Sequence, residues 1–268
     1  IAERGLHIHT PERDFTVHPD ALAEDPHELP VTDLLILATK SYDLTANVEQ
    51  LRPIIGPETI VLPLLNGANI SDQLRELLPG IEVWDGCVYI SARKPAAGEI
   101  LLEAERELFF FGSRSSERSP EEKELFALLD SVKVHAINPD NIQEHIRKKF
   151  VMISATATGT SYFNQTVGDA LTDHPTEMRA LIEELCSLFQ SLGYDLGADA
   201  VERTIERQTF MIPTSTSSMH VDFMAGRPTE LENLTGYVVR TARAHGLSLP
   251  TYEKMYEALA SQPYPPAL

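Results

Sequence analysis

The chain has 268 residues, and its 40 acidic and 22 basic side chains give a formal net charge of −18 with the histidines neutral. Such an acidic surface repels nucleic-acid phosphates and anionic membranes, so we expect neither as a partner. With 43% hydrophobic and 23% charged residues the composition is globular, and the length suggests one large or two modest domains. No run approaches the ~18 to 20 apolar residues that a membrane span needs.

The first half of the chain alternates short strands with helices up to about residue 137, a pattern typical of a mostly parallel sheet covered by helices. Residues 33–38 are nearly all apolar, as expected for a strand buried on both faces. The other elements expected here are strands at 59–64, 82–92 and 107–111 and helices at 42–51, 70–78 and 119–130. Ser119, Pro120 and Glu122 form a capping-box signature at the last of these.

The second half changes to long helical periodicity. The expected helices are 140–158, 175–192, 198–211, 217–225, 230–245 and 251–261. Pro175 and Pro250 stand at probable starts, and Gly193 and Gly246 at probable ends. The chain therefore predicts an α/β domain over 1–138 and an all-α domain over 139–268.

The only two cysteines, Cys87 and Cys186, lie far apart in the sequence and lack metal-ligand spacing. We therefore expect no disulfide framework and predict a reducing, cytoplasmic location. His7 and His9 share a strand face, but the other histidines are scattered, so the sequence predicts no metal site.

Two polar groups follow the buried strands. Lys40 and Asn66 come directly after the strands at 33–38 and 59–64, and open α/β sheets bind ligands beyond such strand ends. Lys40 could give a charge, and Asn66 an amide, to a cofactor or substrate. Alternatively, Lys40 is a solvated lysine and the Asn-Gly pair only a turn.

Three residues of the helical half are further candidates. Lys149 ends a basic cluster and adjoins an apolar run that starts at Phe150, and a buried lysine is costly unless it is paired. A hydroxyl of Ser217 or Ser218 and the Glu230 carboxylate could bind the polar end of a small substrate while a lysine transfers a proton. The alternatives are a charged helix face for the lysine and a helix cap for the serine.

These segments together resemble the ketopantoate reductase family, the 2-dehydropantoate 2-reductases. The resemblance covers nearly the whole chain, and its motifs occur in the family's order. The matching segments are Asp33–Lys40, Leu65-Asn66-Gly67, Gly86–Ala92, Gly98, Phe111-Gly112, Lys149-Phe150, Gly168-Asp169, Ser217-Ser218-Met219, Asp222, Gly226-Arg227, Thr229-Glu230 and Leu234-Thr235-Gly236.

The resemblance implies a Rossmann-like NADP-binding domain, an all-α catalytic domain and reduction of 2-dehydropantoate to pantoate with NADPH, a step of pantothenate and coenzyme A biosynthesis. Lys149 would be the general acid, Glu230 its acidic partner near the substrate, and Ser218 a ligand of the substrate carboxylate. Lys40 and Asn66 would line the cofactor site. We also expect Lys40, Lys149 and Arg227 to form a positive pocket for an anionic 2-keto acid and the cofactor.

The sequence departs from the family pattern in two respects. The family commonly has asparagines four and eight residues after the lysine, where this chain has Ile153 and Ala157, although Ser154, Thr156, Thr158 and Thr160 lie nearby. The chain also has no G-x-G-x-x-G turn and starts at Ile1, so we expect a preceding strand, turn and helix that these residues lack. As written, the chain should bind NADPH poorly.

Three functions remain open from the sequence. The first is an NADPH-dependent ketopantoate reductase, the second a reductase of another 2-keto acid, and the third a non-catalytic relative used for ligand binding or association. The sequence does not choose between NADP and NAD, nor between a monomer and a homodimer.

Overall fold

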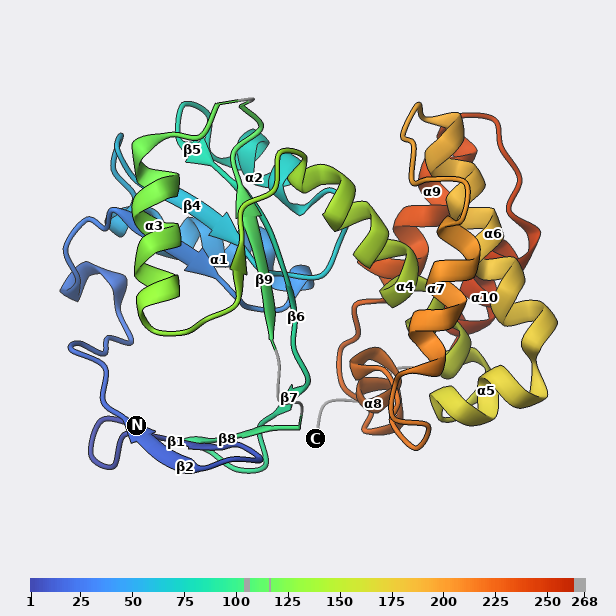
Figure 1. Cartoon of the computed structure of the whole chain (residues 1–268), viewed down its shortest axis with the longest axis horizontal. Helices are drawn as coiled ribbons and strands as arrows, with labels where there is room; N and C mark the ends of the chain where they lie inside the picture. The colour runs from blue at the N-terminus through green and yellow to red at the C-terminus, as the bar shows by residue number, and fades with distance from the viewer. Residues whose placement is uncertain (104–106, 116, 263–268) are drawn as a thin grey trace. The chain divides into compact units, whose positions relative to one another are not determined.

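The computed structural model describes residues 1–103, 107–115 and 117–262 (Figure 1). The predicted second domain thus extends into 263–268, outside the described residues. The chain divides into two compact units: residues 1–38, 44–65 and 69–142 form the sheet unit, and residues 39–43, 66–68 and 143–268 form the helical unit. The domain boundary between 138 and 139 stays a prediction.

The sheet unit contains three small sheets. Their strands are β1 (Leu6–His9), β2 (Asp14–Val17), β3 (Leu34–Leu37), β4 (Ile60–Pro63), β5 (Glu82–Val83), β6 (Asp85–Tyr89), β7 (Ala92–Arg93), β8 (Glu99–Leu102), β9 (Leu108–Gly112) and β10 (Ala136–Ile137). The sheet orders are β3-β4-β5, β10-β9-β6 and β2-β1-β8-β7. The β3-β4-β5 sheet is wholly parallel, while the other two contain both kinds of pairing.

The helices of this unit lie close to their predicted positions. They are α1 (Leu44–Leu51), α2 (Ile70–Leu77) and α3 (Pro120–Ser131), with short 3-10 turns η1 (Pro26–Glu28) and η3 (Arg52–Ile54) and, next to α1 in the chain, η2 (Ser41–Asp43). Ser119 and Glu122 make both bonds of the predicted capping box, so the residue pattern fixed the start of α3 correctly.

Two strand predictions were wrong in detail. The single strand expected at 82–92 is broken at Trp84, where the chain leaves its parallel partner β4 and becomes the antiparallel partner of β9. Burial of the strand at 33–38 on both faces was also wrong, because Ile36 is 44% exposed while Leu37 is 2% exposed. Among the described strands β3 pairs only with β4, so it is an edge strand of its sheet.

The sheet unit contains a buried carboxylate that pairs with two arginines. Asp85, which is 0% exposed, accepts hydrogen bonds from Arg114 Nε at 2.9 Å and Arg75 Nη2 at 3.3 Å. Arg75 also donates to the Val83 carbonyl at 2.5 Å. Because α2, β6 and the end of β9 each contribute a group, the cluster ties three elements together.

The helical unit has seven α-helices among its described residues. They are α4 (Ile142–Phe163, which starts one residue before the unit), α5 (Val167–Asp173), α6 (Pro175–Ser191), α7 (Ala200–Thr209), α8 (Ser218–Met224), α9 (Tyr237–Ala244) and α10 (Pro250–Ala260). Pro175 and Pro250 are the first residues of their helices, and Gly193 and Gly246 follow helix ends with φ of 84° and 69°. The predicted helix starts at the two prolines and the predicted helix ends at the two glycines were thus confirmed.

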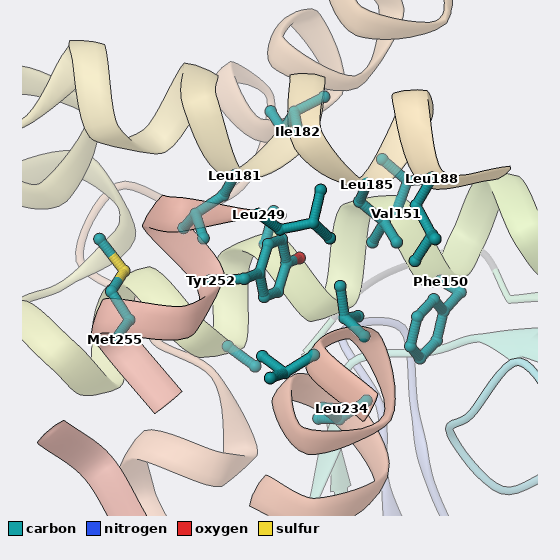
Figure 2. Close-up of a cluster of buried hydrophobic side chains, with 14 of the residues drawn as sticks. Phe150, Val151, Leu181, Ile182, Leu185, Leu188, Leu234, Leu249, Tyr252 and Met255 are labelled. Carbon is teal, nitrogen blue, oxygen red and sulfur yellow. The ribbon is translucent and has the colours of Figure 1, made fainter. Parts of the chain in front are cut away.

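Two features of the helical unit were not predicted. The short helix α5 lies in a segment that was left unassigned, and the helix expected at 230–245 begins with the π-helical turn η4 (Glu232–Gly236) before α9. Figure 2 shows Tyr252 among leucines of α6. Its hydroxyl is hydrogen-bonded to that of Ser154 at 2.9 Å. No helix in the described part of the chain has the length and apolar character needed to cross a membrane.

Candidate active site

The segments that follow β3 and β4 belong by their contacts to the helical unit. Residues 39–43 and 66–68 are grouped with α4 to α10, and they carry the predicted site residues Lys40 and Asn66. Among the predicted site residues, the structure brings Asn66 to Lys149 and Lys40 to Glu230. All five predicted site residues belong to this one unit.

Lys149 is the buried member of its basic cluster. It is 6% exposed, and its Nζ donates a hydrogen bond to Asn66 Oδ1 at 2.9 Å. Lys148 instead pairs with Glu144, and the Arg147 guanidinium lies 3.4 Å from the ring centre of Tyr194. The charged-face alternative thus describes Arg147 and Lys148, and not Lys149.

The next residue along α4 fixes the backbone at this lysine. Phe150 is 1% exposed and packs edge-on against Tyr237 and Phe189, with ring centres 5.5 and 6.1 Å apart. Because aromatic contacts of this kind hold a helix in one rotational setting, the Lys149 side chain leaves α4 in a defined direction.

The carboxylate of Glu230 is buried and hydrogen-bonded to Ser41. It is 4% exposed, and its Oε1 accepts hydrogen bonds from the hydroxyl and the amide of Ser41 at 2.8 and 3.3 Å. Its Oε2 lies 3.7 Å from Lys40 Nζ. The sequence reasoning missed Ser41, for which the only available signal was its position directly after Lys40.

Lys40 also forms a close ion pair with Asp222. Its Nζ lies 2.8 Å from Asp222 Oδ2, while Asp222 Oδ1 accepts a hydrogen bond from Arg227 Nε at 2.9 Å and lies 2.8 Å from Arg227 Nη2. Burial works to lower the pKa of Lys40, but its hydrogen bond to Asp222 and the charges of Glu230 and Asp222 raise it overall. Lys40 is therefore ion-paired, with a side chain that is 38% exposed.

These pairings concern the expected positive pocket. Two carboxylates, Asp222 and Glu230, offset the charges of Lys40 and Arg227. The positive pocket stays a prediction, and the sequence pattern did not show the two carboxylates that the fold places beside Lys40 and Arg227. Of these five charged groups, the excess of one positive charge corresponds to Lys149.

Ser218 is the first residue of α8 and is exposed. The helix cap belongs to its neighbour, since Ser217 Oγ accepts from the His220 amide at 3.1 Å and contacts Thr160 Oγ1 at 2.8 Å. The capping alternative raised for the serines therefore applies to Ser217. The Ser218 hydroxyl is not the cap and is accessible to a ligand.

The loop before Ser218 rests on α5. The amides of Val167 and Gly168 donate to the carbonyls of Ser215 and Pro213, each at 2.9 Å. A Cβ atom on Gly168 would lie 2.8 Å from Pro213 Cβ and 2.9 Å from its carbonyl oxygen. Gly168 is thus needed for the close approach of this loop, which positions Ser217 and Ser218.

The four hydroxyls that the sequence placed near Ile153 and Ala157 have partners within the protein, whereas the buried Ser161 Oγ on the same helix has none among the described residues. Ser154 bonds Tyr252 and the Leu234 carbonyl, Thr156 bonds Gln208 and the Met152 carbonyl, Thr158 bonds Thr235, and Thr160 bonds Ser217 and the Thr156 carbonyl. Ala157 is buried and Ile153 half-buried. This part of α4 therefore presents apolar groups at the two positions four and eight residues after Lys149.

Comparison with known proteins agrees with the order of these motifs. Residues 1–115 match the family described as "Ketopantoate reductase PanE/ApbA", and residues 141–262 match "Ketopantoate reductase PanE/ApbA C terminal". A 2-dehydropantoate 2-reductase from Porphyromonas gingivalis W83 is 42% identical with a TM-score of 0.85, over 97% of this chain and 84% of that one.

Two curated relatives extend the comparison. The Bacillus subtilis protein YkpB, described as an uncharacterized oxidoreductase, is 28% identical over 97% of this chain and 86% of its own length. The 2-dehydropantoate 2-reductase of Salmonella typhimurium is 25% identical over 88% of this chain and 76% of its own length. The chain, with a Rossmann-like α/β part followed by a helical part, belongs to the ketopantoate reductase family of oxidoreductases.

Proposed function

We propose that the protein reduces a 2-keto acid with NADPH, and that 2-dehydropantoate is the first substrate to test. The observation that carries this proposal is the buried ammonium of Lys149, held at 2.9 Å by Asn66. An ammonium beside a ketone can stabilise the developing alkoxide and donate a proton to it.

The nicotinamide of the bound cofactor supplies the hydride. In this scheme Lys149 gives a proton from Nζ to the ketone oxygen, which becomes the hydroxyl of the product. Lys40 and Asn66 would hold the cofactor, since they follow the parallel strands β3 and β4 in the chain. An ammonium and a carboxamide suit the phosphate, ribose and amide groups of such a cofactor.

Glu230 and Ser218 complete the proposed site. The exposed hydroxyl of Ser218 would bind the substrate carboxylate. The Glu230 carboxylate, held by Ser41, would accept a hydrogen bond from a substrate hydroxyl and lie near the lysine. Both roles come from the family resemblance, and the placement of both residues in the helical unit with Lys149 supports them.

A specific observation favours a second candidate substrate. Ile153 and Ala157 are apolar, and the hydroxyls of residues 154, 156, 158 and 160 already have protein partners. Such a surface suits a 2-keto acid whose side group is apolar better than one with a hydroxyl. A reductase of another 2-keto acid is therefore the second proposal, and cytoplasmic location and homodimer formation stay predictions.

The test uses the full-length protein and follows NADPH and, separately, NADH absorbance with 2-dehydropantoate and with 2-keto acids of similar size that lack the hydroxyl. Oxidation of NADPH in the presence of one of these acids supports the proposal, and the preferred acid chooses between the two substrates. Cofactor binding without turnover of any of them would contradict the catalytic proposal and favour a ligand-binding protein.

A further inference from the structure

The carboxylate of Asp222 divides its two oxygens between two cations. Oδ2 accepts a hydrogen bond from the Lys40 ammonium at 2.8 Å, and Oδ1 accepts one from Arg227 Nε at 2.9 Å and lies 2.8 Å from Arg227 Nη2. The side chain of Asp222 is 10% exposed, against 38% for Lys40 and 54% for Arg227. Because a buried carboxylate is costly without partners, Asp222 has one strongly preferred arrangement, with both cations in place.

Lys40 lies between two carboxylates but bonds only one of them. Its Nζ is within hydrogen-bond distance of Asp222 and is 3.7 Å from Glu230. Glu230 Oε1 is occupied by Ser41, the next residue in the chain. Lys40 therefore bonds Asp222, while the next residue, Ser41, bonds Glu230. The bond to Asp222 holds the Lys40 ammonium 3.7 Å from Glu230 Oε2.

We propose that Asp222 is a positioning residue that fixes Lys40 for the cofactor and prevents Lys40 from pairing tightly with Glu230. This inference rests on the proposed function, in which Lys40 contacts the cofactor. The Lys40 ammonium has three N–H donors, so its bond to Asp222 leaves donors for an anionic or hydroxyl group of the cofactor. Arg227 acts through Asp222 by anchoring its other oxygen.

Asp222 could instead only neutralise the charge of Lys40, and that role predicts the opposite change in the cofactor KM. If Asp222 only neutralised Lys40, its negative charge would weaken binding of an anionic cofactor, and removing that charge would lower the cofactor KM. If Asp222 positions Lys40, the same change raises the KM. The direction of the change therefore decides between the two roles.

The experiment uses Asp222→Asn in the purified full-length protein, with Asp85→Asn as the matched control. Asp85 is also a buried carboxylate between two arginines, but it belongs to the sheet unit. The first readout is the rate of Lys40 acetylation by acetic anhydride at about pH 9, compared with Lys148 in the same sample by mass spectrometry. The second readout is the cofactor KM and kcat.

Asp222→Asn is expected to speed Lys40 acetylation roughly threefold or more, because loss of the carboxylate lowers the lysine pKa. It should raise the cofactor KM about tenfold with a smaller change in kcat. Asp85→Asn should change neither quantity. An unchanged acetylation rate, an unchanged or lower KM, or the same effects in Asp85→Asn would overturn the inference.

If Asp222→Asn does not fold, the same two readouts are measured in Asp222→Glu. Its retained charge predicts slow Lys40 acetylation, while its longer side chain shifts the ammonium and predicts a raised KM; an unchanged KM overturns the inference. The failure of the proposed function is a separate result: a wild-type protein that binds no nicotinamide cofactor by calorimetry contradicts both the cofactor role of Lys40 and this inference, whatever the acetylation rates.

Discussion

The buried ammonium of Lys149 donates a hydrogen bond to Asn66, a residue 83 positions earlier in the chain, at 2.9 Å. Asn66 lies in the short segment 66–68 that follows β4 and packs with the helical unit. Its amide group needs little reorganisation to hold the ammonium in one place. This contact joins the predicted acid to the predicted cofactor residue, and it leads to the first prediction.

Asn66→Ala should lower kcat by about ten- to a hundredfold, because Lys149 loses the acceptor that orients its ammonium. The fold should be kept, since the deleted group lies on a connecting segment. Steady-state kinetics and circular dichroism check these two expectations. A variant with wild-type kcat would show that Lys149 does not depend on Asn66.

The buried carboxylate of Asp85 should make stability depend on pH. Burial alone would raise its pKa, but the hydrogen bond from Arg114 and the charge of Arg75 outweigh burial and lower the pKa below the ordinary 3.8. The stabilisation is therefore fully present above about pH 4 and is lost as the pH falls through the lower, folded-state pKa.

Asp85→Asn should lower the free energy of unfolding at pH 7 by about 2 to 4 kcal/mol, because two arginines lose their shared counter-charge. It should also weaken the acid dependence of stability. Urea unfolding at pH 7 and at about pH 3 measures both effects. Glu49→Gln removes an exposed pair with Arg52 and should have no measurable effect; equal losses in both variants would contradict the account.

Gly168→Ala should disturb the loop before Ser218. The new methyl group would lie under 3 Å from atoms of Pro213, so we expect a loss of about 1 to 3 kcal/mol and a higher KM for the keto acid. Gly193→Ala is the control, because Gly193 has a φ of 84° and open space around it and so reports backbone strain alone. A raised substrate KM in the control but not in Gly168→Ala would contradict the role of this loop.

Ile153→Asn should shift substrate preference toward hydroxylated acids. An amide at this half-buried position of α4 can bond a substrate hydroxyl, so the ratio of kcat/KM for 2-dehydropantoate over an acid without the hydroxyl should rise about tenfold. Ile205→Asn makes the same change on α7 and should leave the ratio unchanged. A ratio that does not move in Ile153→Asn would show that this position does not contact the substrate.

Local signals predicted most helix boundaries of this chain. The capping box at Ser119, the prolines at 175 and 250 and the glycines at 193 and 246 act within one turn, and the structure places helix ends at each of them. The break at Trp84 was missed because it depends on a change of strand partner, which periodicity does not show. The π-helical turn at Glu232–Gly236 likewise gave no distinct pattern.

In the candidate site, too, local sequence signals were predictable and long-range contacts were not. A basic cluster leading into apolar residues indicated a functional lysine, and burial distinguishes Lys149 from its neighbours. The pairing of Lys40 with Asp222 and of Ser41 with Glu230 spans 182 and 189 positions. Contacts of that range depend on the tertiary fold, so the sequence supplied the residue types and not their partners.

The central claim, that Lys149 is the general acid of a 2-keto acid reductase, is tested most directly by Lys149→Ala beside Lys148→Ala. NADPH oxidation with the preferred 2-keto acid should fall by about a hundredfold or more in Lys149→Ala, while NADPH binding is retained. Lys148→Ala removes the neighbouring lysine that pairs with Glu144 and should keep wild-type turnover. Wild-type turnover in Lys149→Ala would contradict the account.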